Sequence, residues 1–298
     1  MARISPAAQG SPLAFASVET ALRAAQMELI GSDTPQLDAE VLLAFVTKRT
    51  RTQLRSAPEH LLTDDEYDRF RRLTARRTRG EPIAYLSGTR EFWSLTLHVD
   101  ATVLVPRPET ELLVERALLH MTNPGARILD LGTGSGAIAL AIASERPASD
   151  VLATDASSAA LEVAQRNARE LGLSRVRFQL SDWFGNLGNE QFDIVVSNPP
   201  YIAAGDPQLA ADVLAYEPRQ ALIAGTAGLE AIAVIITTAP RHLQQGGWLI
   251  IEHGIHQAPD VRRLLEQVGF ISVASHADLA GIERVSEGQW PSSVKSGP

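Results

Sequence analysis

The tetrapeptide Asn198-Pro199-Pro200-Tyr201 carries the strongest chemical signal in the sequence. It follows the apolar run FDIVVS, which predicts a buried strand, and its two prolines end strand pairing and keep the backbone extended. The side-chain oxygen of Asn198 and the carbonyl of Pro199 can then face one point. Two acceptors at one point suit a planar NH2 group, and holding both of its hydrogens aims the nitrogen at an electrophile. A strand-ending turn would explain the prolines but not the whole tetrapeptide.

A glycine-rich turn ends another apolar strand, at Gly132-Thr133-Gly134-Ser135-Gly136, and leads directly into the helical run AIALAIA. Glycines let a ligand approach the backbone, and the start of the helix offers free amide groups to an anion. The spacing is G-x-G-x-G rather than the G-x-G-x-x-G of dinucleotide folds, and the segment has no lysine. A carboxylate therefore fits this turn better than a pyrophosphate, while a tight turn without a ligand is the alternative.

Acidic and aromatic residues end the next two predicted strands. Asp155 ends the run VLATD, where a carboxylate can bind both ribose hydroxyls of a nucleoside; a cap for the helix that begins near Ser157 is the alternative. Asp182 and Trp183 end the third strand, where an acid can accept a purine amine and an indole can cover the ring. Trp183 can equally be core. After the glycine turn, these residues predict a nucleoside pocket.

A regular alternation of elements brings these strand ends together. From about residue 92, predicted strands (FWSLTLHV, RILDLG, VLATD, VRFQLSD, FDIVVSNPP, GGWLIIEHG and two late strands) alternate with predicted helices. This order predicts an α/β fold with a parallel sheet that has helices on both faces. Because ligands bind at the carboxyl ends of parallel strands, the polar segments are expected to share one edge.

In the first 80 residues, apolar residues recur at helical spacing and do not alternate with polar ones as they would in a strand. This pattern predicts a small helical domain. Ser17 is expected to cap a helix through about Ile30, and the sequence TDDE at 63–66 has the capping-box pattern that opens another helix ending near Gly80. Four arginines lie along one face of that later helix: Arg69, Arg72, Arg76 and Arg79. A solvated face is the favoured interpretation, and a partner-binding patch is the alternative.

Composition excludes several classes of site. The chain has no cysteine, so disulfides, thiolate metal sites and cysteine nucleophiles are excluded, and its net charge is −8. The acidic excess lies after residue 80, and such a surface repels a phosphate backbone. No apolar run is long enough to span a membrane and the start lacks a signal-type apolar segment, which predicts a cytoplasmic protein without membrane contact.

Together these motifs resemble the class I S-adenosylmethionine-dependent methyltransferases and, more narrowly, the PrmC/HemK family of release factor glutamine methyltransferases. The resemblance extends from about Val18 to Gln289 and is most specific in GEPIAYLSGTREFWSL and VLVPRPETELLVE. It continues in LDAEVLLAFV, ILDLGTGSGAIALAIA, SNPPYI, YEPRQAL, IEHG and DLAGIERV. NPPY alone is shared with adenine and other amino methyltransferases. The run GTAGL at 225–229 departs from the family, which commonly has an acid before Gly-Leu.

The resemblance implies a fold and a division of the chain. The fold would be a Rossmann-like, seven-stranded, mostly parallel sheet with a small N-terminal helical domain. Residues 1–80 would recognise the substrate, 81–100 would form a linker and hairpin, 101–290 would be the methyltransferase domain and 291–298 a disordered tail. The first 15 or so residues would be an extension.

The resemblance also implies ligands for the site. S-adenosyl-L-methionine, leaving as S-adenosyl-L-homocysteine, would contact Gly132 to Gly136, Asp155, Asp182, Trp183 and Asn198. Asn198 to Tyr201 would hold the substrate, the glutamine of the Gly-Gly-Gln motif in class 1 peptide chain release factors, which is methylated on its side-chain nitrogen. No metal is expected, because Gly254 and a strand end separate His253 from His256.

Two other functions compete with this interpretation. A nucleic-acid amino methyltransferase would need a basic recognition domain, and the acidic surface argues against it and against direct DNA binding. A noncatalytic protein-binding module with the same fold would not need the complete Asn198 to Tyr201 segment.

Overall fold

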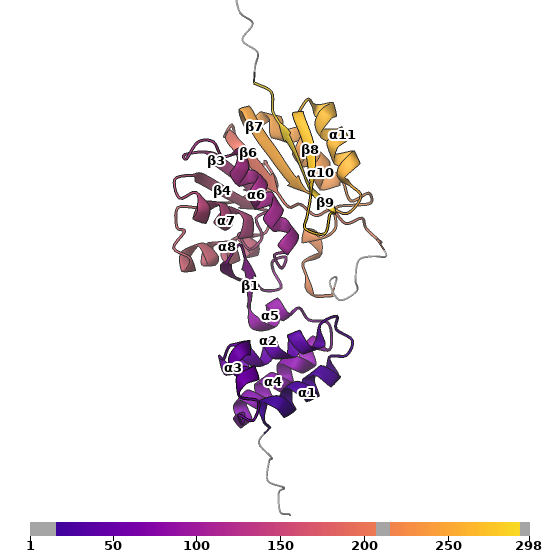
Figure 1. Cartoon of the computed structure of the whole chain (residues 1–298). Helices are drawn as coiled ribbons and strands as arrows, with labels where there is room; N and C mark the ends of the chain where they lie inside the picture. Colours follow the sequence, from indigo (N-terminus) through magenta and orange to yellow (C-terminus); the bar gives the residue numbers. More distant parts are fainter. Residues whose placement is uncertain (1–15, 207–214, 293–298) are drawn as a thin grey trace, which may run out of the picture. The chain divides into compact units, whose positions relative to one another are not determined.

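The computed structural model describes residues 16–206 and 215–292, and the chain divides into two compact units, 1–87 and 88–298 (Figure 1). The expected N-terminal extension lies outside the described residues, as does all but the first part of the expected tail at 291–298. The segment 81–100, expected to be a linker and a hairpin, is divided between the two units. Its first part ends in a helix that packs into the helical core through Leu86, whereas its second part is a hairpin that packs into the sheet domain through Phe92 and Leu97.

The helical unit contains five helices in its described part: α1 (Val18–Glu28), α2 (Pro35–Thr47), α3 (Arg51–Ser56), α4 (Asp64–Arg77) and α5 (Ile83–Ser87). Both predicted caps are confirmed. The Ser17 side chain accepts a hydrogen bond from Thr20 N at α1, and Thr63 and Glu66 form a reciprocal capping box at α4. The short helices α3 and α5 were not predicted, because neither is long enough to show a periodic pattern.

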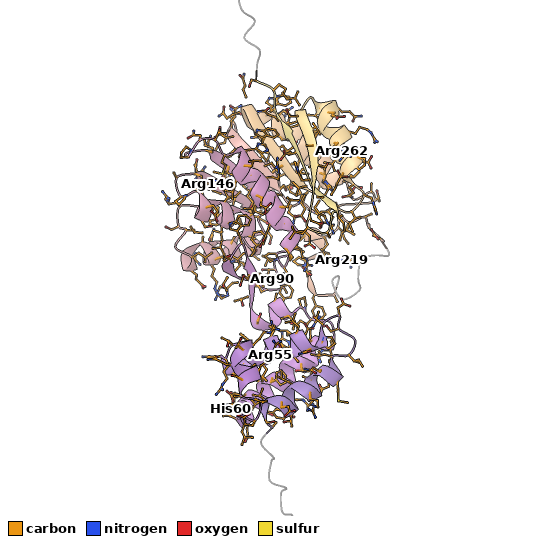
Figure 2. All side chains as sticks on the ribbon, in the orientation of Figure 1. Arg55, His60, Arg90, Arg146, Arg219 and Arg262 are labelled. Carbon is orange, nitrogen blue, oxygen red and sulfur yellow. The ribbon has the colours of Figure 1, made fainter. Side chains whose placement is uncertain are left out.

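Helix α2 buries two acidic side chains while two of its large apolar side chains stay partly exposed. Leu37 and Phe45 are 38% and 41% exposed, whereas Asp38 and Glu40 are buried. Asp38 accepts hydrogen bonds from Arg77 Nε at 2.7 Å and from two hydroxyls, and Glu40 accepts from Arg51 and Arg55 (Figure 2 labels Arg55). Buried carboxylates are tolerated because each has a charged partner.

The basic face of α4 is largely neutralised within its own unit. Arg69 lies 3.9 Å from Asp65, and Arg76 forms an ion pair with Glu81. Among the described residues, Arg72 has no carboxylate oxygen within 4.0 Å. Charges paired in this way fit a helix face that contacts only solvent. Arg72 is the cation of this face that is available to a partner.

The second unit is built on a seven-stranded sheet with the strand order β5-β4-β3-β6-β7-β9-β8. The strands are β3 (Arg127–Leu131), β4 (Asp150–Asp155), β5 (Arg177–Leu180), β6 (Phe192–Ser197), β7 (Leu243–Glu252), β8 (Ile271–Ala277) and β9 (Glu283–Gln289). The first five are parallel, and β9 is antiparallel to both of its neighbours, which confirms the predicted mostly parallel sheet. A separate hairpin, β1 (Thr89–Phe92) and β2 (Leu95–His98), precedes them.

Helices cover both faces of the sheet (Figure 1). Successive residues of β3 face opposite sides, so Ile128 packs with α6 (Glu111–His120) and α7 (Ala137–Glu145), while Leu129 packs with α10 (Glu230–Thr238) and α11 (Ala258–Val268). Helix α8 (Ser158–Glu170) joins the first of these cores through Ala168. The remaining described elements are short 3-10 turns at Pro108–Thr110, Arg219–Ala221 and Ala239–Arg241.

The Asp38–Arg77 pair generates a stability prediction for the helical unit. Arg77→Ala leaves the Asp38 carboxylate buried without its cation, so we expect the free energy of unfolding to fall by about 2 kcal/mol, below the full value for a buried pair because Arg77 is partly exposed. Chemical denaturation measures this change. Arg72→Ala on the same helix is the control and should change it little. Equal stability of the two variants would contradict the role given to the pair.

Candidate functional site

The four polar segments predicted from the sequence meet at one edge of the sheet. They follow β3, β4, β5 and β6, which are adjacent strands, and the chain changes direction across the sheet between β3 and β6. A cavity of about 280 Å³ opens there. Its lining includes Gly132, Thr133, Gly134, Ser135, Asp155, Asp182, Trp183, Asn198 and Pro200. This is the switch point at which open α/β sheets bind ligands.

The glycine turn gives the cavity its backbone wall. Gly132 and Gly134 have φ of 71° and 55°, in the left-handed region that favours glycine. A Cβ at Gly134 would meet no atom within 4 Å, so the turn presents bare backbone to open space. A Cβ at Gly132 would lie 3.6 Å from the Trp183 ring, an ordinary van der Waals distance, so the positive φ is what favours glycine there.

Gly136 serves packing instead of lining the cavity. It precedes α7 with φ of 86°, and a Cβ there would lie 3.0 Å from Leu140 and 3.2 Å from Ala164. The close approach of α7 and α8 therefore requires glycine. Pro199 is buried and lines neither this cavity nor the second one described below, so the expected contact of its carbonyl with a ligand stays a prediction.

Asp155 is held in place by two backbone amides. Its Oδ1 accepts from Ser157 N at 2.8 Å and its Oδ2 accepts from Gly134 N at 2.9 Å. Ser157, whose side chain accepts from Ala160 N, is the actual cap of α8. Each carboxylate oxygen of Asp155 keeps a further lone pair for a hydroxyl at the cavity wall.

Trp183 serves two roles. It packs against the core formed with α10 and α11, and it also lines the cavity. Its φ of 46° is unusual for a large residue. The core and pocket-wall interpretations of this residue are therefore compatible.

A buried acid, Asp130, lies beneath the glycine turn. Its Oδ2 accepts a hydrogen bond from Thr133 Oγ1 at 2.6 Å, and its Oδ1 has no partner among the described residues. Burial raises the pKa of Asp130 to about 7. The carboxyl is thus a polar group under the cavity floor that the sequence reasoning missed.

Asn198 lies where two cavities meet. A second cavity of about 390 Å³ shares Leu104, Arg107, Asn198 and Ala221 with the first, and Tyr201 and Arg284 belong to the second one only. Asn198 Nδ2 donates to Thr110 Oγ1 at 3.2 Å, and no donor within the described residues binds the side-chain oxygen, which can therefore accept a hydrogen bond at the junction. Tyr201 OH donates to Glu252 Oε1 at 3.4 Å.

Two segments that the motif analysis did not assign to the site complete its wall. Thr102, Val103, Leu104, Pro106 and Arg107 line the first cavity together with Pro218, Gln220 and Ala221. Buried Glu217 joins the two segments by accepting from Arg107 at 2.6 Å and from Val105 N at 3.1 Å. Both segments lie in stretches that carry the family resemblance, the first of them in a family-specific stretch, but their contact could not be read from the sequence.

The ring nitrogens of His253, near the end of β7, both lie within hydrogen-bond distance of protein groups. His253 is buried, with Nε2 at 2.9 Å from Ser286 Oγ and Nδ1 at 3.1 Å from Gly254 O, and burial lowers its pKa. Across residues 16–206 and 215–292, no three histidine or acidic side chains are placed to hold a metal ion. The same ranges contain no helix with the length and apolar character needed to cross a membrane.

Two family models match the chain. The methyltransferase small domain matches residues 108–224, and the PrmC N-terminal domain matches residues 20–88. The release factor glutamine methyltransferase of Aliivibrio fischeri is 45% identical over 277 residues, which is 92% of this chain and 98% of that protein. The Escherichia coli K12 protein of the same name is 45% identical over 269 residues, 90% of this chain and 97% of that protein.

Solved structures share the fold at lower identity. The hMettl16 catalytic domain, in complex with MAT2A 3′UTR hairpin 6, has a TM-score of 0.55 at 16% identity and covers 79% of this chain and 85% of that one. A methyltransferase from Pyrococcus furiosus has a TM-score of 0.51 at 20% identity, covering 66% and 89%. The sheet domain therefore has the class I methyltransferase fold.

The buried Glu252 generates a pH prediction. Burial raises its pKa from 4.5 to about 7, so between these pH values the folded protein keeps a proton that the unfolded chain releases. Unfolding is then favoured as pH rises from about 4.5, and the loss of stability is complete above about 7. We expect the stability of the wild type relative to Glu252→Gln to fall across this window in thermal unfolding. A constant difference between the two proteins would contradict the shift.

Proposed function

The chain belongs to the family of release factor glutamine methyltransferases, and we propose on that premise that its substrate is the glutamine of the Gly-Gly-Gln motif in a class 1 peptide chain release factor. The reaction transfers a methyl group from S-adenosyl-L-methionine to the side-chain amide nitrogen. Because release factors act in translation, we also assign the reaction to the cytoplasm.

One observation carries the proposal: Asn198 lies where the two cavities join, and its amide oxygen has no hydrogen-bond donor in the part of the chain that the structure describes. We assign the first cavity to the cofactor and the second to the glutamine side chain. Methyl transfer requires the cofactor and the glutamine side chain to face each other at a short distance. A residue that lines both cavities marks the place where these two ligands meet.

The residues of the first cavity fit the cofactor. Gly134 offers an unobstructed backbone for its methionine part, Asp155 offers oxygens for its ribose hydroxyls, and the Trp183 indole offers a face for its adenine. Asp182 lies on the same wall and can accept the adenine amine. When bound, the cofactor supplies a methyl group on a positively charged sulfur, which is an electrophile.

The residues of the second cavity present the nucleophile. The Asn198 oxygen accepts one hydrogen of the substrate NH2, and we assign the other hydrogen to the Pro199 carbonyl. Two acceptors hold the weakly nucleophilic nitrogen in line and stabilise the positive charge that develops on it. A carbon–nitrogen bond forms as the carbon–sulfur bond breaks, and the nitrogen then loses a proton to water. No strong base is needed before transfer.

The helical unit is the proposed source of selectivity. A site that grips one NH2 group cannot distinguish a release factor from other proteins that contain glutamine, so further surface must contribute. Arg72 offers such a contact. Its neighbours are less available, because Arg69 lies near an acid and Arg76 forms an ion pair with one. The acidic balance of the sheet domain supports a protein partner over DNA.

Asn198→Ala tests the assignment of the acceptor. Removing one acceptor from a closed site is expected to lower kcat about a hundredfold, equivalent to roughly 3 kcal/mol in the barrier, with a smaller change in cofactor affinity. Methylation of purified release factor with labelled cofactor measures kcat. Asn123→Ala, outside both cavities, is the control. Turnover near that of the wild type in Asn198→Ala would remove this residue from the mechanism.

Asp155→Ala and Trp183→Ala test the cofactor cavity. Each should weaken cofactor binding, and loss of the charged acceptor at Asp155 is expected to cost about 1.5 to 3 kcal/mol. Calorimetric titration with S-adenosyl-L-homocysteine measures the affinity of both variants. Asp150→Ala, at the other end of the same strand, is the matched control and should bind normally. If both site variants bind like this control, Asp155 only supports the turn and Trp183 only fills the core.

A further inference from the structure

One side chain, Gln257, joins three backbone segments at the wall of the second cavity. Gln257 directly precedes α11 and lines that cavity. Its Nε2 donates to Tyr201 O at 3.0 Å and to Gly228 O at 3.2 Å. Its Oε1 accepts from Gly254 N at 2.8 Å. One amide group therefore ties the end of the segment 198–201 to the turn after β7 and to the turn before α10.

The partners of this amide fix its orientation and use both of its hydrogens. A backbone N–H only donates and a carbonyl oxygen only accepts, so the reversed amide would face Gly254 N with a donor and two carbonyls with an acceptor. In the observed orientation Nε2 donates to two carbonyls, which uses both of its hydrogens. Gln257 thus has no N–H left for a ligand, and it acts on the site through the segments that it holds.

Glycines at two of these contacts leave the space that the amide needs. A Cβ at Gly228 would lie 2.6 Å from Tyr201 O and 3.1 Å from Gln257 Nε2. A Cβ at Gly254 would lie 3.1 Å from Gln257 Oε1 and 3.2 Å from Tyr201 Cδ2. These distances are shorter than ordinary van der Waals contact, so a larger residue at either position would push the amide or Tyr201 aside.

The segment after Tyr201 belongs to the same wall. Ile202 N donates to Leu222 O at 3.0 Å, and Ala224 N donates to Ile202 O at 3.0 Å. Ile202 and Leu222 both line the second cavity, and neither is among the described residues that line the first. These two bonds hold two loops to each other, whereas Gln257 holds them to the turn after β7. Its side chain does this instead of capping α11, whose amides it does not bind in the described part of the chain.

We propose that Gln257 is a positioning residue for the methyl acceptor: by binding the Tyr201 carbonyl, it fixes the end of the segment 198–201 and with it the wall of the second cavity. This inference rests on the proposed function, because it concerns the cavity that we assign to the glutamine side chain. Methyl transfer is sensitive to small displacements of the nitrogen, so a looser wall lowers turnover even when the substrate still binds. Gln257 is not among the described residues that line the first cavity, so cofactor binding should not depend on it.

Gln257→Met is the first test, with Gln289→Met as the matched control. Methionine has nearly the size of glutamine but donates no hydrogen bond. Gln289 is also half-buried, and its Nε2 donates to Gly246 O at 2.9 Å, away from the described residues that line either cavity. We expect Gln257→Met to lower kcat for release factor about tenfold and to change cofactor affinity less than about twofold.

The control separates positioning from general stability. Both variants lose hydrogen bonds to backbone carbonyls, so both should melt at a lower temperature, but Gln289→Met should keep the kcat of the wild type. Normal kcat in Gln257→Met would overturn the proposal. A loss of kcat that appears equally in Gln289→Met, or that parallels weaker cofactor binding, would also overturn it.

Gly254→Ala disturbs the same contacts without changing Gln257. The φ of Gly254 lies outside the left-handed region, so alanine meets no backbone strain there, but its Cβ would press on Gln257 Oε1 and on the Tyr201 ring. We expect kcat to fall less than in Gln257→Met. The double variant should lose little more than Gln257→Met alone, because both changes act on the position of Tyr201. Fully additive losses would contradict this shared action and overturn the proposal.

Backbone amide exchange tests the inference independently of turnover. Ile202 N and Ala204 N are hydrogen-bonded within this wall, so their exchange with deuterium measures how firmly it is held. We expect faster exchange of the peptide that contains residues 201–204 in Gln257→Met, and wild-type exchange in Gln289→Met. Unchanged exchange in Gln257→Met would overturn the positioning role. A wild type that fails to methylate release factor would instead overturn the proposed function, and the exchange measurement would still decide whether Gln257 holds the wall.

Discussion

The site depends on one geometric constraint: four adjacent parallel strands end at the same edge of the sheet. Strands β3, β4 and β6 carry mainly apolar residues that are mostly buried, so the polar segments follow where these strands leave the core, whereas the edge strand β5 is exposed at both of its ends. The glycine turn, Asp155, Trp183 and Asn198 occupy these four exits. The strand order then determines which groups are neighbours, with Asn198 beside the glycine turn because β6 pairs directly with β3.

Buried carboxyl groups fall into two classes in this chain. Asp38, Glu217 and Glu287 each bind an arginine, and each joins segments that are distant in sequence. Asp130 and Glu252 have no such cation among the described residues, and burial raises the pKa of both to about 7. Glu217 connects two segments of the first cavity's wall, and the two unpaired groups also lie close to the cavities, Asp130 through Thr133 and Glu252 through Tyr201.

The structural features that could be predicted from the sequence are those encoded by a local pattern of residues. Strand ends, the glycine turn and the Thr63 capping box are encoded within a few residues, and the structure has each of them. Contacts between distant segments were missed. Glu217 meets Arg107 across 110 positions, and Asp38 meets Arg77 across 39, so no periodicity predicts either pair.

The two cavities differ in what their walls can recognise. The first is lined by backbone, acids and an indole, the groups that we assign to the cofactor. The second contains Arg284, and Arg107 lines both, yet Arg107 is paired with Glu217 and Arg284 with Asp278. Neutralised cations offer little attraction to an anionic side chain, which agrees with the neutral amide that we propose as the substrate group. A cavity that binds one amide does not distinguish among the proteins that carry it, so surface outside the cavity must recognise the partner.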